Sequence, residues 1–183
     1  KKFFSKKTKI IDCTFNIKSS LKDRIESIRE EAETAVREGS TCLILSDKNI
    51  SDKKAGIPSI LTVGGVHSHL VKHGLRGYCS LNVECSDALD THSFAVLIGV
   101  GATTVNPYLA IDSIYQRFEK KLFGKLDFES CVTRFKKSID AGLLKIMSKM
   151  GISVISSYRG GCNFEAVGLS RAIVAVYFSG MSS

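Results

Sequence analysis

Tryptophan is absent from this sequence of 183 residues, and proline occurs only twice. So little proline, together with 44% hydrophobic residues, excludes a disordered chain, because disordered segments are rich in proline and poor in apolar residues. Long apolar runs are missing as well, and none approaches the roughly 18 residues that a membrane span requires. This length and composition are typical of a globular protein of one or two domains with a substantial core.

A disulfide framework is not expected, although the sequence contains six cysteines. They lie far apart, at Cys13, Cys42, Cys79, Cys85, Cys131 and Cys162. Several stand inside apolar runs such as 41–45, where a reduced thiol behaves as a small hydrophobic side chain. We therefore expect buried, reduced cysteines in a cytoplasmic protein.

Acidic residues are outnumbered, since 26 lysines and arginines against 18 aspartates and glutamates give a net charge of +8. Five basic residues fall at the very start, at Lys1, Lys2, Lys6, Lys7 and Lys9. A basic arm can bind nucleic acid, but a solvated terminal segment is the commoner explanation, and nothing later interleaves basic and aromatic residues. We keep one alternative, namely a non-catalytic scaffold or binding protein with a basic arm, either standalone or degenerate. Nucleic acid is not its expected partner.

Short β-rich runs alternate with helical patterns along the chain. The expected strands cover 10–15, 41–46, 78–84, 103–106 and 153–157. The expected helices cover 20–39, 58–73, 90–99, 107–122 and 127–150, the last either in one piece or broken near Gly142. Residues 41–46 are apolar on both faces, as are parallel strands covered by helices. Repeats of about 30 residues are typical of βαβ units, so the expected fold class is α/β with a mainly parallel sheet.

The common nucleotide-binding and hydrolase signatures are absent. Gly99-Val100-Gly101 is a G-x-G motif, but it follows a helix and precedes a strand, the reverse of a dinucleotide-binding turn. Cys79 and Cys85 lack the further cysteines that an iron–sulfur cluster needs. Glu84 and Asp87 stand at the carboxyl end of an expected strand, where α/β folds place their sites, yet a loop acid is more often solvated than catalytic. These patterns predict no catalytic residue.

Four histidines raise the question of a metal site: His67, His69, His73 and His92. His69 and His73 are four residues apart on one expected helix, a spacing that suits two ligands. No glutamate lies between them, and no third histidine shares their helical face. We therefore expect no metal at these histidines and assign them to helix packing or to the surface.

Three stretches of the sequence, in this order, closely resemble the large (alpha) subunit of glutamate synthase. The first comprises ILSD at 44–47, IPSIL at 57–61 and VHSHLV at 66–71. The second comprises FAVLIG at 94–99, GA at 101–102 and VNPYLA at 105–110. The third comprises LKIMSKMGIS at 144–153, SYRG at 157–160 and FEAVGL at 164–169. The resemblance runs from about residue 10 almost to the end of the chain.

The resemblance implies a piece of a larger enzyme that makes two glutamates from glutamine and 2-oxoglutarate, with electrons passed through FMN and an iron–sulfur cluster. In this family an amidotransferase domain releases ammonia, a central domain helps to wall the ammonia tunnel, and an FMN barrel carries out the reduction. Residues 1–141 are similar to the later part of the central domain, and 142–183 to the opening of the FMN-binding domain. The fold should therefore be TIM-barrel-like but incomplete, with the remaining domains and the small subunit as partners and no membrane.

The resemblance also places FMN beside Lys149, Met150, Gly151, Ile152 and Ser153. Gly151 would let the backbone approach the flavin ring closely, because glycine has no Cβ. Ser153 could hydrogen-bond the polar edge of the ring, and Lys149 could offset the negative charge of reduced flavin. An ordinary helix-to-strand junction is the alternative interpretation of this segment.

The sequence departs from the family pattern in several places. It begins with Lys1 instead of the family's cysteine nucleophile, and it lacks the cluster cysteines and the body of the flavin barrel. Ser68 interrupts a run of three histidines, Gly161-Cys162-Asn163 replaces Ala-Gln-Ile, and Met181 stands where threonine is usual. These departures fit a fragment or a degenerate copy. We expect the chain alone to be inactive and to bind neither FMN nor an iron–sulfur cluster.

An incomplete barrel would leave Ile152, Val154 and Ile155 without their sheet neighbours. The segment 172–178 is uncharged and mostly β-prone, which is the composition of an association-prone stretch. The isolated chain is therefore expected to self-associate, or to keep about its last 40 residues mobile while the part before Gly142 folds more firmly.

Overall fold

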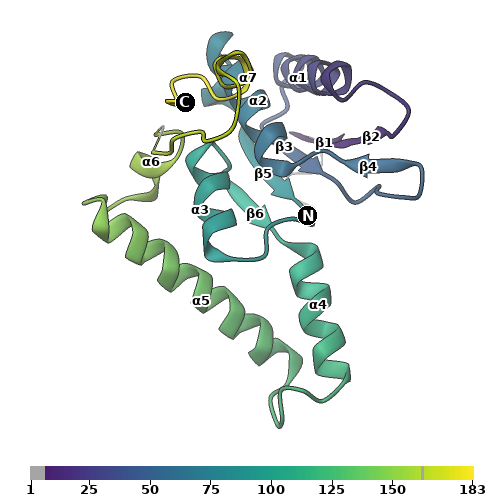
Figure 1. Ribbon diagram of the computed structural model, residues 1–183, viewed down its shortest axis with the longest axis vertical. Coiled ribbons are helices and arrows are strands. Elements are labelled where there is room, and N and C mark those ends of the chain that lie inside the picture. Colours follow the sequence, from purple (N-terminus) through teal and green to yellow (C-terminus); the bar gives the residue numbers. More distant parts are fainter. Residues whose placement is uncertain (1–6, 162) are drawn as a thin grey trace.

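The computed structural model describes residues 7–161 and 163–183 and has the α/β architecture that the sequence predicts (Figure 1). The strands are β1 (Thr8–Asp12), β2 (Thr14–Asn16), β3 (Cys42–Ser46), β4 (Lys54–Gly56), β5 (Ser80–Glu84) and β6 (Thr104–Asn106). The helices are α1 (Leu21–Arg37), α2 (Ser59–Lys72), α3 (Thr91–Gly99), α4 (Tyr108–Glu119), α5 (Phe128–Lys149), α6 (Ile155–Tyr158) and α7 (Arg171–Tyr177), with a 3₁₀ turn η2 (Arg76–Tyr78).

A four-stranded parallel sheet in the order β1-β3-β5-β6 forms the centre of the fold. Its order follows the sequence, because α1, α2 and α3 each return the chain from the carboxyl end of one strand to the amino end of the next. β2 and β4 pair antiparallel as a separate two-stranded ribbon. Lys54–Gly56 is too short and too poor in β-formers for sequence patterns to predict β4.

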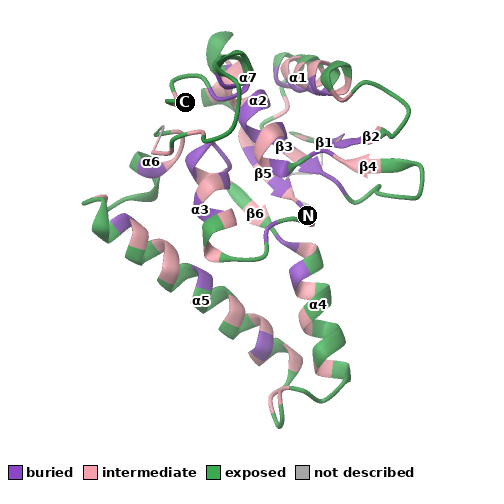
Figure 2. Cartoon of the chain, viewed as in Figure 1, coloured by how far each residue is buried: buried purple, intermediate pink, exposed green. Residues whose placement is uncertain are grey.

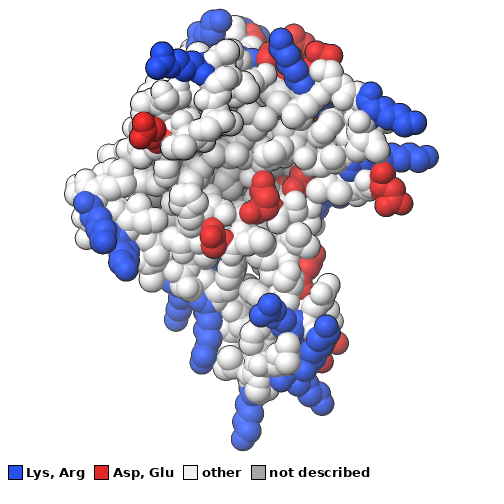
Figure 3. All heavy atoms as spheres, viewed as in Figure 1, with Lys and Arg blue, Asp and Glu red and all other residues white. Residues whose placement is uncertain are grey.

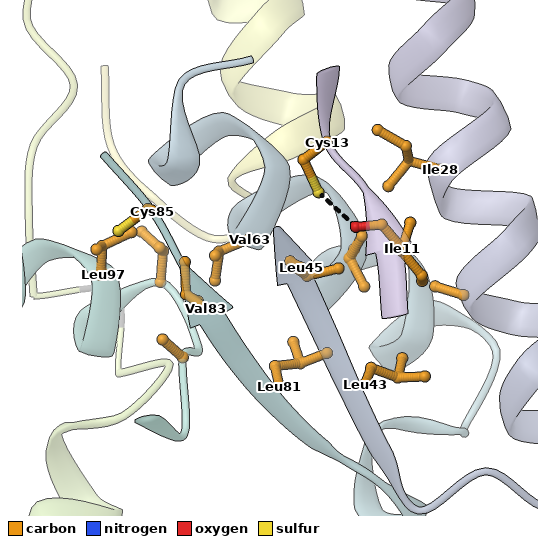
Figure 4. Close-up of a cluster of buried hydrophobic side chains, with 14 of the residues drawn as sticks. Ile11, Cys13, Ile28, Leu43, Leu45, Val63, Leu81, Val83, Cys85 and Leu97 are labelled. Carbon is orange, nitrogen blue, oxygen red and sulfur yellow. Dashed lines mark hydrogen bonds between the residues drawn. The ribbon is translucent and has the colours of Figure 1, made fainter. Parts of the chain in front are cut away.

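One face of the sheet packs against α1, α2 and α3 (Figure 4). Alternate strand residues point toward these helices and are at most 3% exposed, namely Ile11, Leu43, Leu45, Leu81 and Val83. The helices meet them with Ile28, Val63 and Leu97. Because each fully buried aliphatic side chain stabilises the fold by roughly 1.5–3 kcal/mol, this layer is the main source of stability.

No helix covers the opposite face of the sheet within the described part of the chain. The register there aligns one row of side chains through Ile10, Ile44, Asn82 and Thr104. Ile10 is 63% exposed, and Asn82 is held by the Thr104 hydroxyl, which donates to its Oδ1 over 2.7 Å. The interpretation of 41–46 as a strand is confirmed, but on this face Cys42 and Ile44 are only half-buried, and no helix among the described residues covers them.

The helix ends use the residues that the sequence indicates. The Ser20 hydroxyl accepts a hydrogen bond from the N–H of Asp23 at the start of α1, and the Asp90 carboxylate accepts one from the N–H of Ser93 at the start of α3. Gly39, with φ +93°, follows the end of α1 in the left-handed conformation that favours glycine.

After β6 the chain leaves the sheet as a helical hairpin of α4 and α5 (Figure 1). α5 is one helix that passes through Gly142 without a break. A Cβ at Gly142 would lie only 2.5 Å from the Thr91 side chain, so glycine here lets α5 approach α3 closely. Figure 2 shows that most of α4 and α5 is exposed or half-buried. Lysines and arginines gather around the tip of this hairpin in Figure 3.

One expectation for the carboxyl-terminal part is wrong, because residues 153–157 form no strand and instead lead into the short helix α6. The β-prone residues 172–177 belong to helix α7, and Phe178 is its C-cap. α7 packs on α2 and buries Val174, Tyr177 and Phe178 in the main core. Tertiary packing has overridden the local β propensity of this segment, because that propensity largely reflects context.

The described cysteines are unpaired, as expected. Cys13, Cys79, Cys85 and Cys131 are buried and Cys42 is half-buried, whereas Cys162 lies outside the described residues. Burial raises the pKa of Cys13 and of Cys85 to about 12, so both thiols stay protonated and unreactive at neutral pH.

Most of the basic amino-terminal residues, Lys1, Lys2 and Lys6, lie outside the described residues. Within them, Lys9 pairs with Glu31 of α1 at 3.3 Å, as a solvated surface residue does. Among residues 7–161 and 163–183 there is no helix both long and apolar enough to cross a membrane.

Candidate functional site

A row of polar side chains crosses the open face of the sheet at the carboxyl ends of its strands. The parallel register aligns Asp12 of β1, Ser46 of β3, Glu84 of β5 and Asn106 of β6, which we call the carboxyl-end row. Barrels built from parallel βα units place their sites at this end of the strands. The row is therefore the candidate site that the fold itself indicates.

Glu84 is the centre of this row. Its Oε2 accepts a hydrogen bond from the Ser46 hydroxyl over 2.8 Å, and its Oε1 accepts one from the Asn106 amide over 3.2 Å. The Lys48 ammonium lies 2.6 Å from the same Oε1 and 5.3 Å from the centre of the Tyr108 ring. Partial burial raises the pKa of Glu84, but the hydrogen bonds from Lys48 and Ser46 outweigh it, so the pKa lies below its usual value. Glu84 is thus a fixed, ionised acceptor suited to holding polar groups in place.

Asp87, the other acid that the sequence indicates, has a structural role. Its carboxylate accepts hydrogen bonds from the backbone N–H of Ser59 over 2.9 Å and from the Ser59 hydroxyl over 2.6 Å. Ser59 begins α2 behind Pro58, which offers no side-chain cap. Asp87 therefore caps α2 from a distant loop, and its negative charge suits the positive end of the helix dipole.

Sequence patterns alone do not single out Ser46, Lys48 or Asn106. Each stands at or just after the end of an expected strand, so its position at a strand end was the available indication of a functional role. It becomes usable only once the register is known, because the register decides which strand ends lie side by side.

The five residues that the resemblance places beside FMN lie at the end of α5. Lys149 is the last helical residue, Met150 is the C-cap and Gly151 follows with φ +70°. The N–H of Ile152 donates back to the carbonyl of Met147 over 2.9 Å, which closes the helix end in the manner of a Schellman motif. The left-handed backbone at position 151 is therefore enough to account for a glycine there.

This segment presents an open surface. Lys149, Met150, Gly151 and Ser153 are exposed, whereas Ile152 packs into a small apolar cluster. A Cβ at Gly151 would meet nothing within 4 Å, so the backbone is free to be approached from outside. The five residues could serve as one wall of a flavin site, and its other walls would have to come from elsewhere.

Residues 149–153 and the carboxyl-end row lie toward opposite ends of the sheet. α3 starts near the carboxyl end of β5, and Gly142 of α5 lies against Thr91 at that start. Met147 of α5 clusters with Ala95, one turn farther along α3. α5 therefore runs in the same direction as α3, away from the carboxyl-end row, and carries residues 149–153 with it.

His67 is a half-buried residue of α2 whose ring lies against Gly101 and Gly160. Its Nδ1 accepts a hydrogen bond from Nε of Arg76 over 3.0 Å, and Arg76 also donates to the carbonyls of Cys79 and Gly101, the latter over 2.8 Å. Burial, and secondly the charge of Arg76, lower the pKa of His67 to about 4. His67 is therefore a neutral acceptor at pH 7.

Replacing Glu84 with glutamine should make stability less dependent on pH in the acid range. The folded-state pKa of Glu84 is depressed, so its contribution is present above the unfolded-state value of about 4.3 and is lost as the pH falls through the folded-state value. The check is the free energy of unfolding in urea between pH 3 and pH 7 for the wild type and Glu84→Gln. Glu119→Gln, on the exposed surface of α4, is the control, and equal pH slopes for all three proteins would contradict the prediction.

The arrangement of strands and helices is found in solved structures. The chain is similar to DHODH from Eimeria tenella, with a TM-score of 0.55, 16% identity and coverage of 85% of this chain and 38% of that one. It is also similar to a flavocytochrome b2 mutant, with a TM-score of 0.53, 16% identity and coverage of 87% and 44%. The fold is therefore α/β and TIM-barrel-like, and it accounts for less than half of either neighbour.

Sequence comparison then identifies the family. Residues 1–170 match the family model described as the glutamate synthase central domain. The chain is 56% identical over 176 residues to the glutamate synthase [NADPH] large chain of Azospirillum brasilense and 42% identical over 179 residues to that of Bacillus subtilis. It is also 40% identical over 183 residues to the chloroplastic ferredoxin-dependent glutamate synthase of Spinacia oleracea. The chain belongs to the glutamate synthase family.

The matches cover most of this chain but a small part of each relative. They span 94%, 97% and 94% of this chain and 12%, 11% and 11% of the three relatives, respectively. The relatives therefore contain further domains, and the resemblance drawn from the three sequence stretches is confirmed. The alternative of a standalone scaffold with a basic arm is not favoured.

Proposed function

We propose that this chain is a segment of a glutamate synthase that forms glutamate from glutamine and 2-oxoglutarate, and that it supplies scaffold, ammonia-tunnel wall and the first flavin-barrel elements. The observation that carries the proposal is 56% identity over 94% of the chain to a relative of which it spans only 12%. Such a segment acts as part of the whole enzyme, in the cytoplasm, beside the amidotransferase domain, the FMN barrel and the small subunit. By itself it makes no glutamate.

The carboxyl-end row supports the role as a tunnel wall. Ser46, Glu84 and Asn106 form a hydrogen-bonded polar surface on a sheet face that the described residues leave uncovered. A polar, preorganised surface suits the passage of a small hydrogen-bonding molecule such as ammonia, because it exchanges hydrogen bonds without large desolvation costs.

The flavin contribution is assigned to Lys149, Met150, Gly151, Ile152 and Ser153. Their open surface fits one wall for FMN, which would supply the redox chemistry in the parent enzyme together with an iron–sulfur cluster. Lys149 would offer positive charge and Ser153 a hydroxyl. The chain alone is proposed to bind neither group, because enclosing a ring system takes contacts from several sides.

We keep the assignment of residues 1–141 to the central domain and 142–183 to the opening of the FMN-binding domain. The proposed boundary falls inside α5, a continuous helix anchored on α3 by Ala95 and Met147. One rigid element would therefore connect the two domains and fix how the flavin wall is oriented.

A segment swap tests the proposal. The matching 176 residues of the Azospirillum brasilense large chain are replaced by this chain, and glutamate formation from glutamine and 2-oxoglutarate is measured. We expect the chimaera to form glutamate at a rate within about tenfold of the parent, and the isolated chain to form none above background. A chimaera that folds and retains flavin absorbance but makes no glutamate would contradict the proposal, as would turnover by the chain alone.

A further inference from the structure

The outer surface of α1 and α2 brings together two histidines and a glutamate. His69 and His73 are four residues apart on α2, and Glu33 reaches them from α1. Nε2 of His69 lies 2.7 Å from Oε2 of Glu33, and Nδ1 of His73 lies 3.8 Å from the same oxygen. One nitrogen or oxygen of each residue falls within 4.8 Å of the others. We call these three residues the Glu33–His69–His73 cluster.

Both kinds of ligand are in the form that binds a cation. Burial, outweighing the hydrogen bond with Glu33, lowers the pKa of His69 below its ordinary value, so its imidazole is neutral at pH 7. Hydrogen bonds from Arg37 and then His69 lower the pKa of Glu33, so its carboxylate is ionised. The side chains are 12%, 21% and 34% exposed for His69, Glu33 and His73, so an ion from solvent can reach them.

We propose that the Glu33–His69–His73 cluster binds one divalent transition-metal ion of the zinc type. Two imidazoles and one carboxylate are a donor set that zinc accepts, with the fourth position left to water. Ligand atoms around a tetrahedral zinc at about 2.0–2.1 Å lie roughly 3.4 Å apart. The widest pair of the cluster, within 4.8 Å, must therefore close by at most about 1.4 Å, and the pair of His69 and Glu33, 2.7 Å apart, must open by about 0.7 Å. No metal is expected from the sequence when only histidines are considered as ligands. Glu33 lies 36 residues before His69 in the chain, and the packing of α1 on α2 brings it to the histidines as a third ligand.

A bound ion would replace the hydrogen bonds that hold the three side chains of the cluster. Nδ1–H of His73 donates to the carbonyl of His69 over 2.8 Å, and Nε2–H of His69 donates to Oε2 of Glu33 over 2.7 Å. An imidazole nitrogen binds a metal through its lone pair, so His69 and His73 must adopt the tautomers that leave Nε2 and Nδ1, respectively, without a proton. Arg37, 2.8 Å from Oε1 of Glu33, competes with the ion for this carboxylate. The bound ion would tie α1 to α2.

Zinc titration of the chelator-treated full chain tests the proposal, with calorimetry for stoichiometry and a thermal melt for stabilisation. We expect one Zn²⁺ per chain and a rise in melting temperature on binding, because an ion that binds only the folded state stabilises it. His73→Ala and Glu33→Gln should each weaken binding at least tenfold, and Arg37→Gln should tighten it. His92→Ala, an exposed histidine of α3 outside the cluster, should leave affinity unchanged.

His73 is exposed, so His73→Ala should fold, and circular dichroism checks this. If Glu33→Gln fails to fold, His73→Ala against His92→Ala still decides the question. Absence of stoichiometric zinc binding, or equal affinity in the wild type and His73→Ala, would overturn the proposal. The segment swap described above addresses glutamate formation, so the two proposals fail independently.

Discussion

Replacing Arg76 with leucine should lower the free energy of unfolding by about 3 kcal/mol, because it leaves buried acceptors without a donor. Arg76 donates to Nδ1 of His67 and to the carbonyls of Cys79 and Gly101, so it ties α2, the start of β5 and the turn before β6 together. Leucine fills part of the volume but provides no hydrogen bond.

Urea denaturation at pH 7 measures this effect. Arg117→Leu, at an exposed position of α4, removes the same charge without a buried partner and should change stability by less than about 0.5 kcal/mol. A loss of stability no larger in Arg76→Leu than in Arg117→Leu would show that the three acceptors find other donors.

Replacing Gly64 with alanine should detach α7 from α2 and cost about 2 kcal/mol or more. A Cβ at this position would lie 2.5 Å from the Phe178 ring and 2.8 Å from the carbonyl oxygen of Tyr177. The ring could turn aside, but the backbone carbonyl cannot move without moving the helix. The expected result is therefore loss of the burial of Val174, Tyr177 and Phe178, with α2 itself still folded.

Hydrogen exchange of the α7 amides, together with urea denaturation, tests this prediction. Fast exchange in Gly64→Ala and slower exchange in the wild type are expected, and Gly77→Ala is the control because a Cβ there meets nothing within 4 Å. The same wild-type data test the expectation that about the last 40 residues are mobile. The buried side chains of α7 favour protection of that helix, so equally fast exchange in the wild type and Gly64→Ala would refute the packing argument.

The parallel sheet and helices α1 to α4 could be predicted from the sequence because local signals agree with one another there, whereas the ribbon of β2 and β4 could not, and the expected strand 10–15 divides between β1 and β2. Ser20 and Asp90 mark helix starts by their capping side chains, and the β-rich runs recur at the spacing of βαβ units. Such signals depend on residues that are close in the chain. The structure has helices and strands where these signals predict them. The location of Glu84 at a strand end followed from the same logic.

The rest depends on contacts between distant residues. α7 is helical because Tyr177 and Phe178 fill a surface on α2, and nothing within 172–178 encodes that partner. The carboxyl-end row needs the register of four strands, and the meeting of Glu33 with His69 needs the packing of α1 on α2. The proposal that residues 149–153 contact a flavin comes only from the family resemblance, because an exposed helix end has no sequence pattern of its own.

The strand order β1-β3-β5-β6 has a consequence for how the protein is made. Every new strand adds to the growing edge of the sheet, and none has to insert between strands already paired. On the ribosome, the neighbour that each strand after β1 adds to has therefore already been synthesised when that strand emerges. α7 is the exception, because the hydrogen bond from Ser68 to the carbonyl of Tyr177 joins residues 109 positions apart. Until translation reaches α7, the nascent chain exposes the apolar surface of α2 around Gly64, and a chaperone that binds apolar segments would find its target there.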